Sequence, residues 1–348
     1  MINKIYMNNF SSFLNHFSSF HIKKKIKHLI LHVTNHCNFR CSHCFVDFVT
    51  PKKDLKFSEY EELSKSLNDF FWLDIGGGEP FLRKDLYKIV NLFKKQIVSI
   101  PTNGWLKKNI IEQIELIDKK SCELVINLSL DGLENTHNIV RKNNESWEKV
   151  WEMFEVLKKI KDIKVRFITV VHKDNYDEII PLMKIVQNKG ADFHSVILLR
   201  GDPVDPNVML PSIEKLNKLA VEMFPILEKY DYGTNNISAY LLKNYHRYLW
   251  KTSLKTIERK TQVVPCLAGQ SHMVIWGDGK ISSCEMLPPF GNIKDNKILE
   301  LINGTKHIEQ VNSIKNKECH CTHNCALITS ILYNPSKWGN LIYQKKPD

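Results

Sequence analysis

Short apolar runs alternate with amphipathic stretches along the chain between Leu29 and Leu199. The apolar runs have the length of buried strands, and the stretches between them carry apolar residues three and four positions apart, which favours helices. This alternation is typical of repeated βα units that form a parallel sheet. We expect six strands, at Leu29–Thr34, Phe71–Ile75, Ile97–Ile100, Leu124–Leu130, Val165–Val171 and Phe193–Leu199. We expect helices at Ser58–Phe70, Leu86–Lys95, Leu106–Lys119, Trp147–Ile160 and Tyr176–Lys189.

The predicted fold class is therefore α/β, because right-handed crossovers would curl six such units into a partial (β/α)6 TIM-like barrel. Functional residues of these barrels gather on the loops that follow the C-terminal ends of the strands. The unusual polar and glycine residues of this chain obey that rule, and we expect them on one rim: Cys37 to Cys44, Gly76 to Pro80, Thr102 to Gly104, Ser129, Asp131 and Arg200.

The sequence changes character after the proline-rich stretch Gly201–Pro206. Two helices are expected there, at Ser212–Tyr230 and Ile237–Lys260, and from Val263 the chain turns to short strands with a tight hairpin at Trp276–Lys280. We predict four parts: a basic amphipathic N-terminal arm (1–27), the partial barrel (28–205), a helical connector (206–262) and a smaller C-terminal α+β domain (263–348).

Composition narrows the class of protein. The chain has 348 residues, of which 43% are hydrophobic, enough for a well-buried core. It has neither a recognisable signal peptide nor an apolar run long enough to span a membrane. Its nine cysteines are clustered, which in a reducing compartment indicates metal binding or catalysis rather than disulfides. We therefore expect a cytoplasmic protein without a transmembrane segment.

The net charge of +11 comes largely from the N-terminal arm, where Met1 to His28 contains five lysines and no acid. Phe10, Phe13, Phe17 and Phe20 recur there at helical spacing, which favours a helix packed on its own domain. A membrane surface or an acidic partner are the alternatives. Nucleic acid is not expected as a partner, because these aromatics alternate with serine rather than lysine and no nucleic-acid motif accompanies them.

The first cysteine group, Cys37, Cys41 and Cys44, follows the first predicted strand. Three thiolates from one loop can hold three irons of a 4Fe–4S cube and leave the fourth iron open to a small molecule. Zinc is the competing interpretation, with His36 and His43 close enough to serve as ligands, although structural zinc sites are closed. An open iron would indicate catalysis.

The second group holds five cysteines, more than one closed site needs: Cys266, Cys284, Cys319, Cys321 and Cys325. A 4Fe–4S cube would use four of them and leave one thiol free, and zinc again competes. Cys122, the ninth cysteine, begins the fourth strand on the opposite rim, and we expect it to be buried and inert. The glycine run Gly76–Gly78 would let the backbone approach a ligand closely, with Glu79 placed to accept hydrogen bonds from an ammonium group.

Together these motifs closely resemble a known family. Cys37-x3-Cys41-x2-Cys44, Gly77-Gly78-Glu79-Pro80 and Ser129-x-Asp131-Gly132 resemble the radical S-adenosylmethionine (radical SAM) enzymes. The C-terminal pattern, Cys266-x12-Gly279-x4-Cys284 and Cys321-x3-Cys325, resembles the auxiliary-cluster domains called SPASM or twitch. The full SPASM pattern has seven cysteines for two clusters, so the five found here imply one auxiliary 4Fe–4S cluster. Its expected ligands are Cys266, Cys284 and Cys325 with Cys321 or Cys319.

The resemblance implies a role for each residue of the first site. The first three cysteines would hold the catalytic cluster, whose open iron binds the amino and carboxylate groups of S-adenosylmethionine. Glu79, within the Gly77-Gly78-Glu79 segment, would hold the methionine ammonium. His43 replaces the aromatic residue that usually lies near the adenine. Ser129 and Arg141 match positions that contact the carboxylate and Asn103 reaches the same cofactor, although Ser129 as a plain strand end and Arg141 as a solvated helix residue remain alternatives.

The resemblance also implies the chemistry, in which one electron, from a donor such as flavodoxin or ferredoxin, cleaves the cofactor and the resulting 5′-deoxyadenosyl radical abstracts hydrogen from a substrate. The auxiliary cluster would then accept an electron (oxidation), or the surplus thiol among Cys319 and Cys321 would return hydrogen (epimerisation). Arg200 is a candidate clamp for a substrate carboxylate or phosphate, with a surface salt bridge as the alternative.

The expected substrate is a polar metabolite such as a sugar, and the first alternative is a peptide. Peptide-modifying relatives often begin with a leader-binding domain, whereas the first strand here begins by Leu29, so a peptide substrate is the second choice. A protein of another class, a non-catalytic zinc or iron–sulfur protein that binds nucleic acid, is the remaining alternative.

Overall fold

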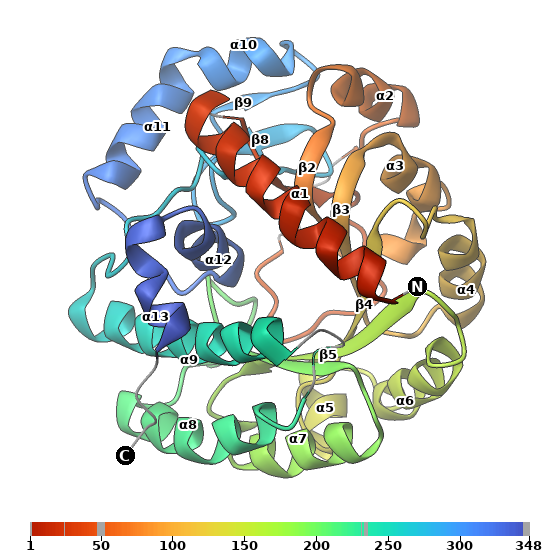
Figure 1. Cartoon of the computed structure of the whole chain (residues 1–348). Coiled ribbons are helices and arrows are strands. Elements are labelled where there is room, and N and C mark those ends of the chain that lie inside the picture. Colours follow the sequence, from red (N-terminus) through yellow and green to blue (C-terminus); the bar gives the residue numbers. More distant parts are fainter. Residues whose placement is uncertain (1, 24, 47–52, 231, 233–235, 344–348) are drawn as a thin grey trace.

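The computed structural model describes residues 2–23, 25–46, 53–230, 232 and 236–343 (Figure 1). Six parallel strands form a curved sheet in the order β6-β5-β4-β3-β2-β1, which confirms the predicted partial barrel of α/β class. All six predicted strands are present: β1 (His28–His32), β2 (Asp69–Gly76), β3 (Lys94–Thr102), β4 (Glu123–Ser129), β5 (Ile163–Val171) and β6 (Phe193–Leu198).

Helices cover the outer face of the sheet (Figure 1). The predicted ones are α2 (Phe57–Ser66), α3 (Leu86–Leu92), α4 (Lys107–Leu116), α6 (Ser146–Leu157) and α7 (Ile179–Asn188), together with short turns η1 (Pro80–Leu82) and η2 (Tyr176–Glu178). Helix α5 (Glu134–Arg141) was not predicted, because its sequence is mostly polar and only His137, Val140 and Arg141 are buried. Alternate residues of β1, such as Leu29 and Leu31, are fully buried among the apolar side chains of the core.

The sheet does not end at β1. Strand β7 (His272–Ile275) pairs in parallel with the other edge of β1, and β8 (Lys280–Ser282) and β9 (Gly291–Asn292) follow antiparallel. The predicted hairpin between β7 and β8 is confirmed, but the sequence did not predict that this hairpin extends the barrel sheet. The C-terminal residues therefore build on the same nine-stranded sheet as the barrel.

The remaining helices lie on either side of this extension. The two predicted connector helices are present as α8 (Ile213–Leu227) and α9 (Asn236–Arg259), and β6 packs against them through residues such as Phe193. After β9 come α10 (Ile298–Asn303), α11 (Thr305–Lys315), α12 (Asn324–Leu332), η3 (Pro335–Lys337) and α13 (Gly339–Ile342). Among the described helices, none combines the length and apolar character that crossing a membrane requires.

Helix α1 (Ile2–Lys23) lies across one end of the strands (Figure 1). Three of its aromatic side chains pack on the domain itself: the ring of Phe13 lies 5.6 Å from that of Phe71, and the rings of Phe17 and Phe20 lie 6.3 and 4.9 Å from that of Tyr333. The side chain of Phe10, which the sequence placed in the same stripe, lies outside the described residues. This packing confirms the interpretation of the N-terminal stripe as a helix that contacts its own domain.

The docking of α1 can be tested on two residues of the same helix. Phe20 is 5% exposed and Ile22 is 76% exposed. Phe20→Ala should lower the free energy of unfolding by about 3–5 kcal/mol, because it leaves a cavity against Tyr333, whereas Ile22→Ala should change it by less than about 0.5 kcal/mol. Urea unfolding followed by circular dichroism measures both, and equal stability of the two variants would contradict the docking.

Candidate active site

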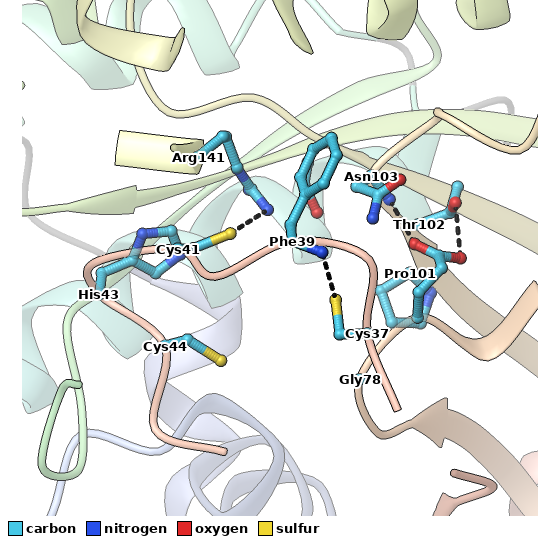
Figure 2. A pocket seen from close by; sticks show the side chains of 12 residues that line it. Cys37, Phe39, Cys41, His43, Cys44, Gly78, Pro101, Thr102, Asn103 and Arg141 are labelled. Atoms are coloured by element: carbon cyan, nitrogen blue, oxygen red, sulfur yellow. Dashed lines mark hydrogen bonds between the residues drawn. The ribbon is translucent and has the colours of Figure 1, made fainter. Parts of the chain in front are cut away.

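The predicted site residues meet in one cavity at the C-terminal ends of the strands (Figure 2). The three cysteines come from the loop after β1, Gly78 and Glu79 from the loop after β2, Asn103 from the loop after β3, and Ser129 from the end of β4. Of the residues predicted for this site, all but Gly77 line the cavity: Cys37, Cys41, His43, Cys44, Gly78, Glu79, Asn103, Ser129 and Arg141. Phe39 and Pro101 also line it and were not predicted, and so does Thr102, which was expected on this rim but without a role.

Glycines after β2 bring that loop against the cysteine loop. Gly77 has φ = +123°, and a Cβ atom there would lie 2.2 Å from the carbonyl oxygen of Thr34. A Cβ atom on Gly78 would lie 2.1 Å from the carbonyl oxygen of His36 and 2.9 Å from Cβ of Cys37. The backbone N–H of Gly78 donates to Thr34 over 3.0 Å. The close approach expected for these glycines is therefore made to the cysteine loop itself, which only residues without a side chain permit.

Glu79 is a carboxylate held deep in the cavity wall. It is 1% exposed and accepts hydrogen bonds from the backbone N–H of Asn103 (2.8 Å), the hydroxyl of Thr102 (2.9 Å) and the backbone N–H of Phe81 (3.3 Å). Burial raises its pKa to about 7, against the opposing effect of these donors. A cation beside Glu79 would offset that cost of burial, as the ammonium group predicted from the sequence would do.

A buried ion pair stands on the opposite wall of the cavity. Arg141 from α5 places Nη2 2.5 Å from Oδ2 of Asp131, and its Nη1 donates to Sγ of Cys41 over 3.6 Å (Figure 2). Burial opposes the charge of Asp131, but Arg141 and the nearby histidines hold the pKa of that carboxyl well below its usual range. Arg141 is thus neither a solvated helix residue nor a surface side chain, and Asp131 orients it.

His43 lies on the same side of the cavity as the ion pair (Figure 2). Its Nε2 is 3.7 Å from Oδ2 of Asp131, and its ring stacks parallel to that of His172 with centroids 6.2 Å apart. Burial lowers the pKa of His43 to about 4. Asn103 donates through Nδ2 to Asn38 of the cysteine loop over 2.9 Å, so this residue braces the loop as well as lining the cavity.

The donor set of the cavity fits an iron–sulfur cluster. Burial raises the pKa of the Cys37 thiol to about 12, so thiolates at this place need a cationic metal to stabilise them. Two donors already point at the sulfurs: the backbone N–H of Phe39 toward Cys37 over 3.4 Å, and Arg141 toward Cys41. Such donors are typical of the surroundings of cluster ligands.

Four of the five C-terminal cysteines interact with one another. The thiol of Cys284 donates to Cys321 and lowers the pKa of Cys321 to about 6. Besides burial, the charge of Cys321 contributes to the raised pKa of Cys266 and of Cys319. Gln262 bridges Cys266 and Cys319: it accepts from the N–H of Cys266 and donates to the carbonyl of Cys319, both over 3.0 Å. These four residues could hold one closed cluster.

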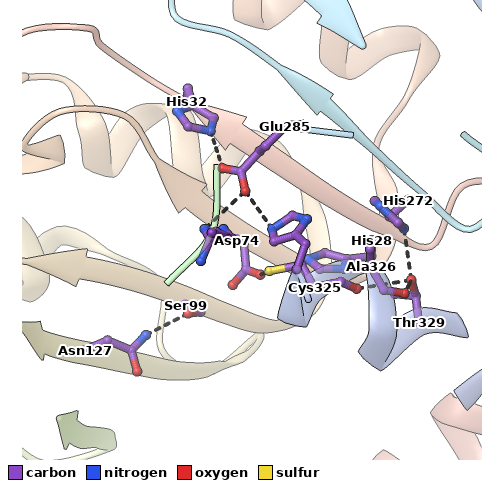
Figure 3. A network of polar contacts seen from close by, with 12 residues as sticks. His28, His32, Asp74, Ser99, Asn127, His272, Glu285, Cys325, Ala326 and Thr329 are labelled. Atoms are coloured by element: carbon purple, nitrogen blue, oxygen red, sulfur yellow. Dashed lines mark hydrogen bonds and ion pairs between the residues drawn. The ribbon is translucent and has the colours of Figure 1, made fainter. Parts of the chain in front are cut away.

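Cys325 faces a different set of partners (Figure 3). Its thiol donates to Oδ2 of Asp74 over 3.4 Å, and the same oxygen lies 2.8 Å from Nε2 of His28. His28 and Asp74 belong to β1 and β2, so this thiol points toward the barrel strands. The sequence interpretation counted Cys325 as a ligand and gave the surplus role to Cys319 or Cys321, and the contact with Asp74 sets Cys325 apart from the other four C-terminal cysteines.

Arg200, predicted as a substrate clamp, is engaged within the protein. Its Nη2 lies 3.2 Å from Oε2 of Glu285, and its guanidinium lies 5.1 Å from the ring centroid of Phe45. Burial opposes the charge of Glu285, but His323, Arg200 and His32 hold the pKa of this carboxyl well below its usual range. The partner Glu285 follows Cys284 directly, and the sequence gave no signal for it.

Cys122 lies immediately before β4, as predicted, but is half-buried rather than fully buried, with its thiol 3.5 Å from the carbonyl oxygen of Asp118. It is thus remote in the fold from both cysteine groups and serves as a natural control for thiol variants.

Two protein-family models match this chain. The radical SAM superfamily matches residues 31–186, and an iron–sulfur cluster-binding domain, SPASM, matches residues 266–326. The two matched segments contain the two cysteine groups described above. They favour iron–sulfur clusters over zinc at both places.

Among curated proteins, the chain is similar to GTP 3′,8-cyclases. It is 30% identical over 184 residues to that of Campylobacter jejuni (strain RM1221), covering 50% of this chain and 56% of the relative. It is 31% identical over 183 residues to that of Staphylococcus carnosus (strain TM300), covering 48% and 52%. The chain thus spans about half the length of the curated relatives it matches.

Solved structures share the fold. Native anSMEcpe with bound AdoMet has a TM-score of 0.59 at 17% identity, covering 90% of this chain and 95% of that one. Streptococcus suis SuiB bound to the precursor peptide SuiA has a TM-score of 0.61 at 16% identity, covering 88% and 71%. From its two cysteine groups, its partial barrel and these matches, we conclude that the chain belongs to the radical SAM superfamily, carries a C-terminal SPASM domain and uses S-adenosylmethionine, a radical SAM cluster and an auxiliary cluster.

Proposed function

We propose that this protein cleaves S-adenosylmethionine reductively and abstracts a hydrogen atom from a polar substrate held inside the barrel. The observation that carries the substrate class is the polar lining of the strands' concave face (Figure 3). Asp74 and His28 meet there, and Asn127 donates to Ser99 over 2.7 Å. A hydroxyl-rich or amino-bearing substrate would find further hydrogen-bond donors and acceptors on these strands, whereas an apolar one would gain nothing from these polar groups.

Each wall of the cavity has a task in this proposal. Cys37, Cys41 and Cys44 hold the catalytic cluster, which, when bound, supplies an open iron for the cofactor and the electron that cleaves it. Glu79 binds the methionine ammonium, and Arg141 binds the methionine carboxylate while Asp131 fixes its orientation. Gly78 allows the Glu79 loop to lie directly against the loop that holds the cluster. Ser129, Asn103 and His43 contact the rest of the cofactor.

The reaction that follows abstraction is, in this proposal, an epimerisation that uses Cys325. The thiol hydrogen of Cys325 passes to the substrate radical, which forms the new C–H bond and leaves a sulfur-centred radical on Cys325. One electron from an external donor of the flavodoxin or ferredoxin class and one proton, delivered through Asp74 and His28, restore the thiol. Oxidation is the alternative outcome, in which the substrate radical loses an electron and a proton instead of gaining hydrogen.

A peptide is the second candidate substrate, and a cavity beside β6 supports it. All six residues of this end strand, Phe193 to Leu198, line that cavity together with Tyr245 and Trp250 of α9. The Tyr245 hydroxyl and the Trp250 ring N–H are buried and have no hydrogen-bond partner among the described residues. An extended peptide segment would offer carbonyl groups to both and would pair with the strand edge.

Cluster assembly should depend on Gly78 but not on Gly76. A Cβ atom on Gly78 collides with the cysteine loop, whereas the nearest atoms to one on Gly76 belong to the His32 ring, at 3.4 Å, an ordinary contact distance. Gly78→Ala should therefore reduce the iron content of anaerobically reconstituted protein from about eight to about four atoms per chain. Gly76→Ala should keep about eight. Equal iron content of the two variants would show that the glycine contact does not shape the cluster loop.

Thiol variants should separate the two cysteine groups. Cys41→Ala should abolish formation of 5′-deoxyadenosine, because the catalytic cluster loses a ligand. Cys284→Ala should retain abortive cofactor cleavage but form no product, and Cys122→Ala should match the unmodified protein. Chromatography of 5′-deoxyadenosine measures cofactor cleavage in all three variants, and mass spectrometry of the substrate measures product formation. If Cys284→Ala and Cys41→Ala lost cleavage equally, the C-terminal group would have a structural role only.

The substrate class can be found in one labelling experiment. Fully deuterated metabolite and peptide fractions, prepared separately from cells, are incubated with the reconstituted protein, and mass spectrometry detects deuterium in 5′-deoxyadenosine. We expect deuterium from the metabolite fraction; deuterium from the peptide fraction alone would favour the second candidate.

The hydrogen donor is tested with the fraction that responds. In deuterium oxide, with unlabelled substrate, the epimerised product should gain one deuterium through Cys325, and Cys325→Ala should still consume the cofactor but incorporate none. A product two hydrogens lighter than the substrate, formed equally by Cys325→Ala, would establish oxidation instead.

A further inference from the structure

His323 stands between a candidate ligand of the auxiliary cluster and a buried carboxylate. Its side chain is fully buried at the start of α12, with Nδ1 3.6 Å from Sγ of Cys284 and Nε2 2.6 Å from Oε2 of Glu285. No role was predicted for His323 from the sequence, where it is one of two histidines, with His320, among the closely spaced cysteines. Its two ring nitrogens thus contact two consecutive residues of the chain after β8.

Glu285 is itself fixed by the barrel. Its Oε1 lies 2.8 Å from Nε2 of His32, the last residue of β1, and its Oε2 lies 3.2 Å from Nη2 of Arg200, beyond β6. The carboxylate side chain is 6% exposed, so solvent does not compete for these partners. With both oxygens occupied by barrel residues, Glu285 has little freedom to move, and it sets the orientation of the His323 ring.

We propose that His323 is a positioning residue that donates a hydrogen bond to the Cys284 sulfur and thereby raises the reduction potential of the auxiliary cluster. This inference rests on the proposed ligand role of Cys284. The contact of Nε2 with the Glu285 carboxylate fixes the ring so that Nδ1 faces the Cys284 sulfur, an anionic acceptor when this cysteine is a thiolate ligand. A donor to a ligand sulfur stabilises the more negative, reduced form of a cluster, and burial keeps that effect from being screened by water.

The arrangement also links the two cysteine groups. His32 lies five residues before Cys37 on the strand that leads into the catalytic loop, and Glu285 follows Cys284 directly. Glu285 therefore connects the segment that leads to the first cluster with the segment that holds the second, through a hydrogen bond with His32 and a close polar contact with His323. With its reduction potential raised in this way, the auxiliary cluster is suited to accept an electron from a substrate radical or to return an electron to the cavity of the first cysteine group.

The test is a potentiometric titration of the full chain that carries Cys41→Ala, monitored by electron paramagnetic resonance. In this background only the auxiliary cluster gives a signal. His323→Gln and His323→Asn form a matched pair, because the Asn amide replaces the donor at Nδ1 and the Gln amide reaches only the Nε2 position. His323→Asn should keep the midpoint potential near that of the background, whereas His323→Gln and His323→Phe should lower it. His320→Phe, at an exposed position of the same segment, should have no effect.

Three results would decide against the proposal. An unchanged potential in His323→Gln with full iron content would show that the histidine does not act on the cluster. An equal decrease in His323→Asn and His323→Gln would show that the ring matters through packing alone. If Cys284→Ala in the same background still held about four irons with an unaltered spectrum, the ligand assignment of the proposed function would be wrong, and this outcome is distinct from the first two.

Discussion

Strand β1 is the element on which both sites depend. It pairs in parallel with β2 on one side and with β7 on the other, with His28 opposite both Trp72 and His272. The loop after β1 carries the first cysteine group, the loop after β2 carries Glu79, and the hairpin after β7 leads to Cys284. Because hydrogen-bonded strands fix the relative position of the segments that follow them, pairing at β1 places the cavity of the first group and the second group on one rigid framework.

The contacts between the loops that follow these strands depend on two requirements: space for close backbone approach, and a partner for every buried charge. Gly77 and Gly78 have no side chains, so the Glu79 loop can touch the cysteine loop. Arg141 needs a counter-charge when buried, and Asp131 supplies it while leaving the guanidinium beside Cys41. Glu285 likewise needs cationic or donor partners in the barrel, and obtains them from β1, from the segment after β6 and from the start of α12.

Much of this arrangement could be predicted from the sequence. All six barrel strands were predicted, because the spacing of apolar residues reflects which positions are buried. The rim on which the site lies was predicted as well, because the C-terminal ends of parallel strands lie at the same end of the barrel. What the sequence did not reveal is the pairing of distant residues, namely Asp131 with Arg141, Glu285 with Arg200, and His323 with Cys284. Nothing in local spacing shows that β7 joins β1, or that Cys325 faces Asp74 while the other four C-terminal thiols interact with one another. Such pairings join residues that are far apart in the sequence and become visible only in the three-dimensional structure.

The central claim is that the three-cysteine loop leaves an iron open for the methionine end of the cofactor beside Glu79 and Arg141. Electron–nuclear double resonance of the reduced protein, with S-adenosylmethionine labelled by nitrogen-15 at its amino group, tests this claim most directly. The account predicts a nitrogen-15 coupling to the catalytic cluster that is absent in Cys41→Ala. A fully reduced cluster that binds the cofactor without any such coupling would contradict it.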